Sequence, residues 1–289
     1  MDLFAYDYMQ RALAGALIIG LVAPSLGIYL VQRKLSLIGD GIGHVALTGV
    51  GVGLLLDRSP VLTAVVVAAL GAIGVELVRE RGRTSGDLAL ALLFYGGIAG
   101  GVVLVGLSDD STNANLMQFL FGSLTTTSGT DLTVIAILGG AVLLTMVALR
   151  PALFAVCHDE EYARVSGLPV RTLNLLMAVT TAVTVTIAMR TVGLLLVSAL
   201  MVVPVAAAQQ VTRGFRGTMA AAMGIGLSAA AVGVWASAEA DTAPGATIVI
   251  VAIAAFVAVT VGGGVRRALR RTVVPAGAEH EPPDVVLHQ

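Results

Sequence analysis

The stretch LSLIGDGIGHVALTGVGVGLLL, residues 35–56, decides how the rest of the chain is interpreted. It is long and apolar enough to form a membrane-spanning helix, yet it carries Asp40 and His44. Their i, i+4 spacing places both side chains on one helix face, one turn apart. A carboxylate inside a spanning helix costs roughly 2.5–3.5 kcal/mol on insertion scales, and such groups usually face a bundle interior or an aqueous path. Carboxylate oxygen with imidazole is a ligand set that suits divalent Zn, Mn or Fe.

The same stretch also has a purely structural interpretation. Asp40 and His44 can hydrogen-bond between helices, and two side chains are fewer than the four ligands of a typical structural zinc site. The residues alone leave both interpretations open, although membrane surroundings favour a functional role. Glycines along the stretch fit either one, since they let backbones approach or leave room for an ion: Gly39, Gly41, Gly43, Gly49, Gly51 and Gly53.

Composition restricts the class of protein. The chain has 289 residues, of which 57% are hydrophobic and 12% charged, and its mean hydropathy is +0.93. Soluble domains carry about 25% charged residues, so we expect an all-α integral membrane protein. The net charge of −1 gives no reason to expect nucleic-acid binding. The single cysteine, Cys157, excludes an intramolecular disulfide. The first ten residues carry acids and no base, so no cleavable signal peptide is expected.

Apolar stretches along the chain predict the number of spans. A helix crossing a membrane core of about 30 Å needs about 20 residues. Nine stretches are long enough or nearly so: 10–32, 37–56, 60–78, 87–107, 131–149, 172–189, 191–211, 217–236 and 245–265. We therefore expect one bundle of about eight to nine spans over residues 1–271, followed by a disordered cytoplasmic tail at 272–289. The piece FLFGSL, residues 119–124, is expected to be interfacial or re-entrant.

Basic residues predict the orientation of the bundle. All but three of the 17 Lys and Arg residues follow the first, third, fifth, seventh or ninth span; the exceptions are Arg11, Arg58 and Arg190. Because cytoplasmic loops carry the excess of basic residues, the N-terminus is predicted outside and the C-terminus in the cytoplasm. The pair of spans around Arg190 has almost no connection, so a broken or re-entrant pair there would change the count.

The loop CHDEEYARVSGLPV, residues 157–170, predicts a short helix on the cytoplasmic surface. Glu160 and Glu161 lie in its first turn, where the helix dipole favours negative charge. Gly167 ends the helix, and Pro169 prevents it from continuing. The segment is either a solvated connector or a docking helix for a soluble partner.

Two further features concern the spans. Pro204 lies within the seventh span, where a proline removes a backbone hydrogen bond and kinks or breaks the helix. Glu76 is expected to lie near the cytoplasmic end of the third span, beside Arg79, as a boundary charge.

Five motifs in order give the chain a resemblance to a known family. They are LSLIGDGIGHVALTGV at 35–50, FLFGSL at 119–124, DEEYARVSGLPV at 159–170, VGLLLVSALMVVPVAAAQ at 192–209 and DTAPGATIVI at 241–250. Over residues 10–265 the chain resembles the permease subunits of bacterial ABC importers for zinc, manganese or iron (ZnuB-type, ABC-3 family). Its first motif is similar to the family's S-x-x-G-D-x-x-x-H pattern.

The resemblance implies a homodimeric permease in a bacterial plasma membrane, with a cytoplasmic ABC ATPase and an extracytoplasmic metal-binding protein as partners. It implies that Asp40 and His44 line the metal path and that Asp241 is a further candidate, although the following proline lies one place later than in the common D-x-P-x-G arrangement. It also implies that the loop with Ala163 and Gly167, opened by the acids Glu160 and Glu161, couples to the ATPase. The divalent ion is cargo, and no permanently bound cofactor is expected.

The chain itself is not expected to hydrolyse ATP, because it contains no Walker A pattern, G-x-x-x-x-G-K-[ST]. Two alternatives to an ATP-driven permease remain: an intramembrane metalloenzyme using Asp40 and His44, and a passive metal channel. The enzyme would need a third ligand and a base, and no H-E-x-x-H motif is present. The channel would not need a docking helix. Asp with His does not decide which metal is carried.

Overall fold

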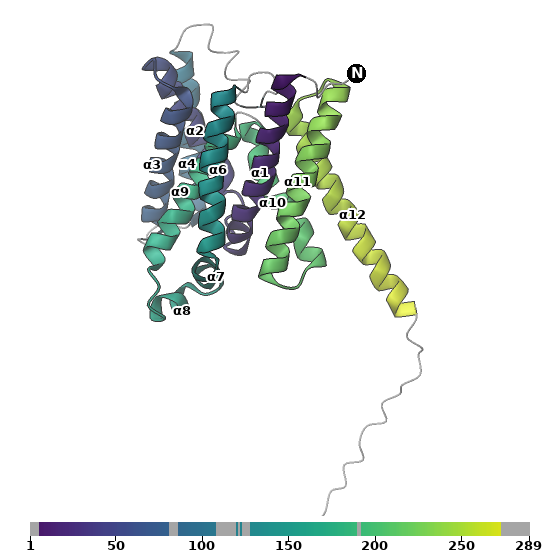
Figure 1. Cartoon of the computed structure of the whole chain (residues 1–289). Coiled ribbons are helices and arrows are strands. Elements are labelled where there is room, and N and C mark those ends of the chain that lie inside the picture. The colour runs from purple at the N-terminus through teal and green to yellow at the C-terminus, as the bar shows by residue number, and fades with distance from the viewer. Residues whose placement is uncertain are drawn as a thin grey trace, which may run out of the picture.

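The chain folds into a bundle of helices (Figure 1). The structure, a computed structural model, describes residues 6–80, 86–107, 120, 122, 128–189 and 192–272. Within these residues it contains helices and no strands. Their bounds are α1 (Asp7–Gln32), α2 (Ile38–Leu55), α3 (Pro60–Glu80), α4 (Gly86–Gly106), α6 (Gly129–Ala148), α7 (Arg150–His158), α8 (Glu160–Val165), α9 (Val170–Ala188), α10 (Leu194–Val211), α11 (Phe215–Ala240) and α12 (Pro244–Thr272).

All nine predicted apolar stretches form helices, which confirms an all-α polytopic fold. Seven of the helices in the described part of the chain are long and apolar enough to cross a membrane. The other two, α4 and α10, contain shorter apolar stretches at Leu88–Leu104 and Val197–Val211. Of the piece FLFGSL only residues 120 and 122 are described, so its expected interfacial or re-entrant form stays a prediction, and the tail at 273–289 lies outside the described residues.

The helices form two packed groups. On one side α2 packs against both α3 and α4, and α9 packs against α3. On the other side α1, α10, α11 and α12 pack against one another, and α6 packs on α1 (Figure 1). Since lipid tails are as apolar as leucine, such helices associate through close packing of small residues rather than through the hydrophobic effect.

Glycines permit the closest approaches between helices. A Cβ atom on Gly49 of α2 would lie 2.6 Å from the Cα of Ala64 in α3, and one on Gly97 of α4 would lie 2.6 Å from the backbone nitrogen of Val45. A Cβ on Gly20 of α1 would lie 2.7 Å from the carbonyl oxygen of Gly226 in α11. The glycines of α2 therefore act at least partly in packing, as one of the two interpretations of that stretch expects.

The expected helix break at Pro204 is not observed. Helix α10 runs without interruption from Leu194–Val211 with Pro204 inside it. The proline removes one backbone hydrogen bond, but the turns on both sides are held by packing against α1, α11 and α12. The interruption lies instead just before α10, where Gly193 has a φ of +93° that glycine adopts without strain.

The short helix in the polar loop is confirmed. Helix α8 begins after Asp159, whose side chain accepts a hydrogen bond from the backbone N–H of Tyr162 at 2.9 Å. Such an N-cap satisfies one of the free N–H groups of the first turn. The helix ends before Gly167, which has a φ of +81°. The acidic start and glycine stop predicted from the sequence therefore both operate.

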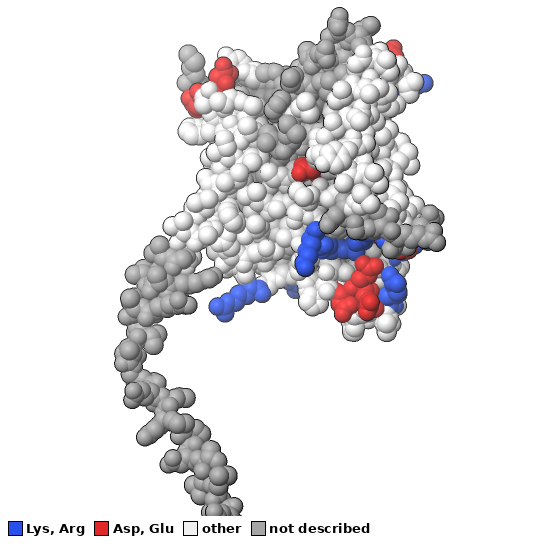
Figure 2. Space-filling view, turned by 180° about the vertical axis from the view of Figure 1, so that it is seen from behind, with Lys and Arg blue, Asp and Glu red and all other residues white. Residues whose placement is uncertain are grey.

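Charged side chains gather at the end of the bundle that carries α8. Figure 2 shows Lys and Arg there together with Asp and Glu, next to a broad surface that is almost free of charge. A smaller number of charged side chains lies at the opposite end (Figure 2). An uncharged band between two charged ends is the distribution expected of a membrane-spanning bundle.

Candidate functional site

Asp40 lies in the first turn of α2, near the start of the helix and not at its middle. The helix dipole favours a negative charge in this turn, so burying the carboxylate costs less here than at the centre of a span. The side chain is half-buried and lines a pocket of about 450 Å³ whose other walls come from the start of α2 and from α4. These walls are Leu37, Leu90, Ala91, Phe94 and Tyr95. The carboxylate is therefore accessible from an otherwise largely apolar cavity.

His44 lies one turn further along the same face of α2. The edge of its ring contacts Phe94, with ring centroids 4.6 Å apart. Its Nδ1 atom is buried and has no hydrogen-bond partner among the described residues. A neutral imidazole offers one nitrogen lone pair to a metal ion. The Asp40–His44 pair thus combines an accessible carboxylate with a ring nitrogen that no other group occupies.

Thr48 continues this face by another turn, although it is not among the residues predicted to be functional. Its hydroxyl donates a hydrogen bond of 2.7 Å to the carbonyl oxygen of Gly97 in α4. The i, i+4, i+8 spacing with Asp40 and His44 was the available signal. Because its hydroxyl hydrogen is used in this bond, Thr48 holds α2 against α4.

One chain does not supply a complete metal site within the described residues. No group of three or more His, Cys, Asp or Glu side chains is found close together in that part of the structure. On the other face of α2, Gly39 lies against Ser198 of α10, whose hydroxyl is buried without a partner there. A third acid or imidazole would have to come from outside the part of the chain that the structure describes.

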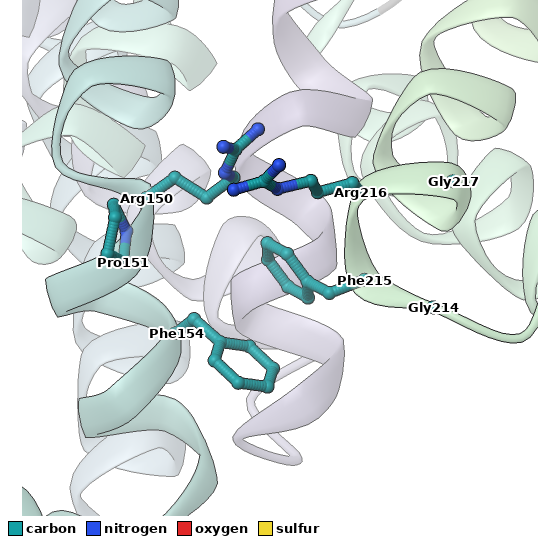
Figure 3. Close-up of a pocket in the computed structure, with 7 residues that line it drawn as sticks. All are labelled: Arg150, Pro151, Phe154, Gly214, Phe215, Arg216 and Gly217. Atoms are coloured by element: carbon teal, nitrogen blue, oxygen red, sulfur yellow. The ribbon is translucent and has the colours of Figure 1, made fainter.

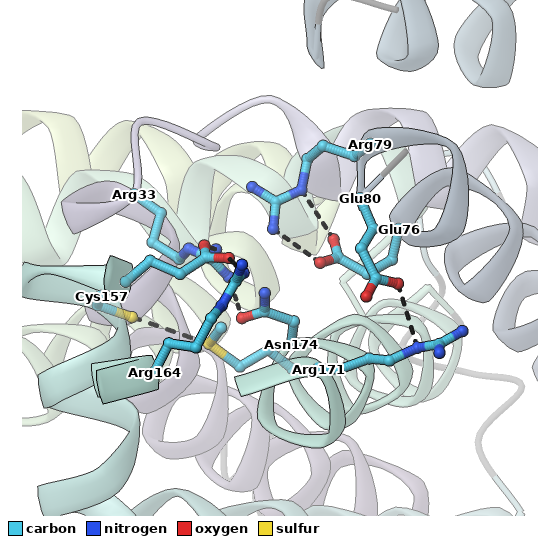
Figure 4. Close-up of polar contacts among 10 residues, drawn as sticks. Arg33, Glu76, Arg79, Glu80, Cys157, Arg164, Arg171 and Asn174 are labelled. Carbon is cyan, nitrogen blue, oxygen red and sulfur yellow. Dashed lines mark hydrogen bonds and ion pairs between the residues drawn. The ribbon is translucent and has the colours of Figure 1, made fainter. Parts of the chain in front are cut away.

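A second set of polar contacts ties α8 to the bundle (Figure 4). Arg33, directly after α1, donates hydrogen bonds of 2.7 Å to Glu160 Oε2 in α8 and of 2.7 Å to Asn174 Oδ1 in α9. The Arg33 side chain is only 7% exposed. Burial, together with the neighbouring positive charge of Arg79, lowers the pKa of Arg33 from its usual range. Glu160 also forms an ion pair of 3.3 Å with Arg164, which is 70% exposed.

Two more ion pairs lie beside this connection. Glu76, which is buried in the last part of α3, accepts hydrogen bonds of 2.9 and 2.7 Å from Arg79, the neighbour expected from the sequence. Arg171 contacts Glu80 at 3.1 Å and joins α9 to α3. A polar pocket of about 490 Å³ is lined by Arg171 and by the three glutamates of these contacts: Glu76, Glu80 and Glu160. The α8 end of the bundle is therefore cross-linked by charge between helices that are far apart in sequence.

The outward face of α8 differs from the one that the sequence suggested. Ala163 is fully buried against the bundle, whereas Glu161 and Gly167 are exposed. The exposed large hydrophobic side chains of α8 are Tyr162 at 67% and Val165 at 89%. Their i, i+3 spacing puts them on one face, and this spacing was the signal that the sequence analysis did not use.

The remaining candidate residue, Asp241, lies at the end of α11. It is exposed and adopts a φ of +49° at the helix C-cap. Ser237 donates a hydrogen bond of 2.6 Å to the backbone oxygen of Thr242, which fixes the same turn. The observed contribution of Asp241 is to the end of the helix, at the opposite end of the bundle from α8 (Figure 1).

Comparison with known proteins shows the family of the chain. A family model described as the ABC 3 transport family matches residues 5–262. The manganese transport system membrane protein MntC of Halalkalibacterium halodurans is 31% identical over 255 residues, covering 88% of this chain and 87% of that protein. The chelated iron transport system membrane protein YfeD of Yersinia pestis is 31% identical, covering 94% and 91%. The high-affinity zinc uptake system membrane protein ZnuB of Haemophilus influenzae is 29% identical, covering 87% and 96%.

A solved structure has the same arrangement of helices. The structure of PsaBC from Streptococcus pneumoniae in complex with Fab matches with a TM-score of 0.82 and 27% identity. The match covers 93% of this chain and 97% of that one.

Proposed function

Because the chain belongs to the ABC 3 transport family, we propose that it is the permease of an ATP-driven importer that moves a divalent zinc, manganese or iron ion into the cell. A cytoplasmic ATPase hydrolyses the nucleotide, and an extracytoplasmic protein delivers the metal. Relatives named for manganese, iron and zinc transport support the class of cargo and leave its identity open.

The observation that carries this proposal is the Asp40–His44 pair. A carboxylate and a partner-free imidazole nitrogen share one helix face beside an apolar pocket, in a bundle whose other spans contain few charges. Ionisable groups in such surroundings usually mark an ion path. The pair binds the ion only while His44 is neutral, since a protonated imidazole has no free lone pair.

A second copy of the chain completes the ligand set. Two copies related by a twofold axis contribute two carboxylates and two imidazoles, which is about the number of ligands that such ions take. The half-buried Asp40 and the exposed Tyr95 on the same pocket support a contact between copies at this face. The ion then passes between two α2 helices.

The orientation follows from the charges. The end with α8 holds Arg33, Arg79, Arg164 and Arg171, and basic residues favour the cytoplasmic side. The N-terminus is then outside, and α8 faces the ATPase with Tyr162 and Val165. Motion of the ATPase displaces α8, and the Arg33 contacts carry that displacement to α1 and α9.

The proposal is tested by metal uptake in a strain lacking its own importers. Cells express the chain with its ATPase and binding protein, and Zn, Mn and Fe are supplied separately. Wild type should accumulate at least one of them only when the ATPase is active, which separates it from a passive channel. Asp40→Ala and His44→Ala should each lose most uptake, because each removes a ligand.

The matched control is His158→Ala, which removes an exposed imidazole far from the pocket and should leave uptake unchanged. All variants are compared at equal amounts of inserted protein. Near-normal uptake by both Asp40→Ala and His44→Ala would show that the pair is structural.

A further inference from the structure

A pocket of about 470 Å³ lies between the start of α7 and the start of α11. Figure 3 shows Arg150 at one wall and Arg216 at the other, with their guanidinium groups pointing toward each other and α1 behind them. Phe154 and Phe215 form the apolar part of the lining. The pocket is separate from the Asp40–His44 face and from the Arg33 contacts.

The two arginines of the pocket differ from the four arginines at this end of the bundle that form ion pairs. Arg33, Arg79, Arg164 and Arg171 each have a glutamate partner. Among the described residues neither Arg150 nor Arg216 is in an ion pair. Two positive groups that face one another without an acid repel each other, and an anion between them removes the repulsion.

The apolar part of the pocket is firmly built. The rings of Phe154 and Phe215 lie 4.9 Å apart, and Phe215 lies 5.2 Å from the ring of Tyr29. Tyr29 is fully buried, and its hydroxyl donates a hydrogen bond of 2.8 Å to the carbonyl oxygen of Met146. Tyr29 is in the last turns of α1 and Met146 in the last turn of α6, so the pocket lies where these spans leave the membrane.

We propose that this pocket binds the phosphate group of an anionic phospholipid. Guanidinium groups bind phosphate oxygens through paired, charge-assisted hydrogen bonds, and basic pockets at the ends of spans suit anionic headgroups. The phenyl rings provide apolar contact for the glycerol and upper acyl chain. A free phosphate ion needs no such surface, which favours a lipid over a soluble anion. The bound lipid joins the start of α11 to the start of α7.

The test uses the full-length purified protein, reconstituted without partners and analysed by native mass spectrometry. It is titrated with phosphatidylglycerol or, as a neutral comparison, phosphatidylcholine. Wild type should retain phosphatidylglycerol in preference to phosphatidylcholine. The double variant Arg150→Gln/Arg216→Gln should lose roughly tenfold or more of that preference, since each basic residue near an anionic surface contributes to binding. The double variant Arg164→Gln/Arg171→Gln removes the same charge at the same end and should keep it.

A charge-conserving variant keeps the test decisive if the Gln double variant does not fold. Arg150→Lys/Arg216→Lys retains both charges without the paired donor geometry, and it should keep phosphatidylglycerol more weakly than wild type does. The proposal is overturned if wild type shows no preference for the anionic lipid, or if both Gln double variants lose it equally. It is also overturned if inorganic phosphate alone displaces the lipid, or if the Arg150→Gln/Arg216→Gln variant keeps the wild-type preference for phosphatidylglycerol.

Discussion

Replacing Arg33 with alanine should separate ATP hydrolysis from metal transport. The change removes the donor of both 2.7 Å contacts, the one to Glu160 and the one to Asn174. Breaking a fully buried ion pair costs about 3–5 kcal/mol. Because the Glu160 side chain is 37% exposed and keeps Arg164, we expect a smaller loss of about 1–3 kcal/mol in the attachment of α8 to the bundle.

Arg164→Ala is the matched control, since it removes the other arginine that contacts Glu160. Arg164 is 70% exposed, and an exposed i, i+4 pair contributes about 0.3–0.5 kcal/mol. Both variants therefore remove one positive charge that contacts the Glu160 carboxylate, but the expected loss of free energy differs several-fold between them. Arg33→Lys keeps the charge without the forked geometry and should give an intermediate result.

The assay measures metal ions moved per ATP hydrolysed in proteoliposomes that contain the chain, its ATPase and its binding protein. A loss of about 2 kcal/mol makes the detached state of α8 roughly 30 times more populated relative to the attached state. Arg33→Ala should then hydrolyse ATP while moving several-fold fewer ions per ATP, and Arg164→Ala should match wild type. An Arg33→Ala complex with the wild-type ratio would refute the reasoning, even if its thermal stability were lower.

Three further outcomes are expected. Ala163→Trp should weaken co-purification of the ATPase, because overpacking the buried side of α8 displaces the helix. Gly167→Trp should also weaken it, because Gly167 has a left-handed backbone conformation that tryptophan rarely adopts. Normal transport by both variants would show that this loop is only a connector. Burial raises the pKa of the Cys157 thiol to about 11, so roughly 0.1% or less of it is thiolate at about pH 7.5. Maleimide labelling of Cys157 should therefore be slow at neutral pH and accelerate as the pH rises toward the pKa of the thiol. Fast labelling at neutral pH would contradict the burial. Because Cys157 itself should label slowly, introduced cysteines can report the topology. Asp57→Cys should be labelled from outside intact cells, and Arg213→Cys only after the membrane is opened; the reverse result would mean that the predicted topology is inverted.

Local chemistry is what the sequence predicted well. The bounds of helix α8 are set by two residues close to it in the chain, Asp159 at its start and Gly167 at its end, so they follow from the local sequence. The nine apolar stretches likewise needed only length and composition. Of the kink or break predicted at Pro204, the break is absent, because packing by distant helices holds α10 together; a kink stays a prediction.

Contacts between distant segments could not be read from the sequence. Arg33 and Glu160 are separated by 127 positions, and the partner of each depends on how α1, α8 and α9 pack. The sequence also could not show which face of α8 carries Ala163, because a small residue fits either a partner surface or the face that packs on the bundle. The structure buries Ala163 against the bundle. For His44, the neighbouring Phe94 belongs to a helix two elements later.

The position of Arg33 in the chain links the two candidate regions. Its side chain holds α8, and only a short turn separates its backbone from α2, which begins at Ile38 and carries Asp40 in its first turn. Lys34, within this turn, takes a left-handed conformation with a φ of +59°. We expect a displacement of α8 either to stretch the 2.7 Å contact between Arg33 and Glu160 or to move the start of α2. The second outcome shifts the Asp40 carboxylate relative to α4, which changes the pocket beside it. If an ATPase docks on α8 as proposed, we expect it to act on the Asp40–His44 face in this way, through Arg33 and the turn that follows it.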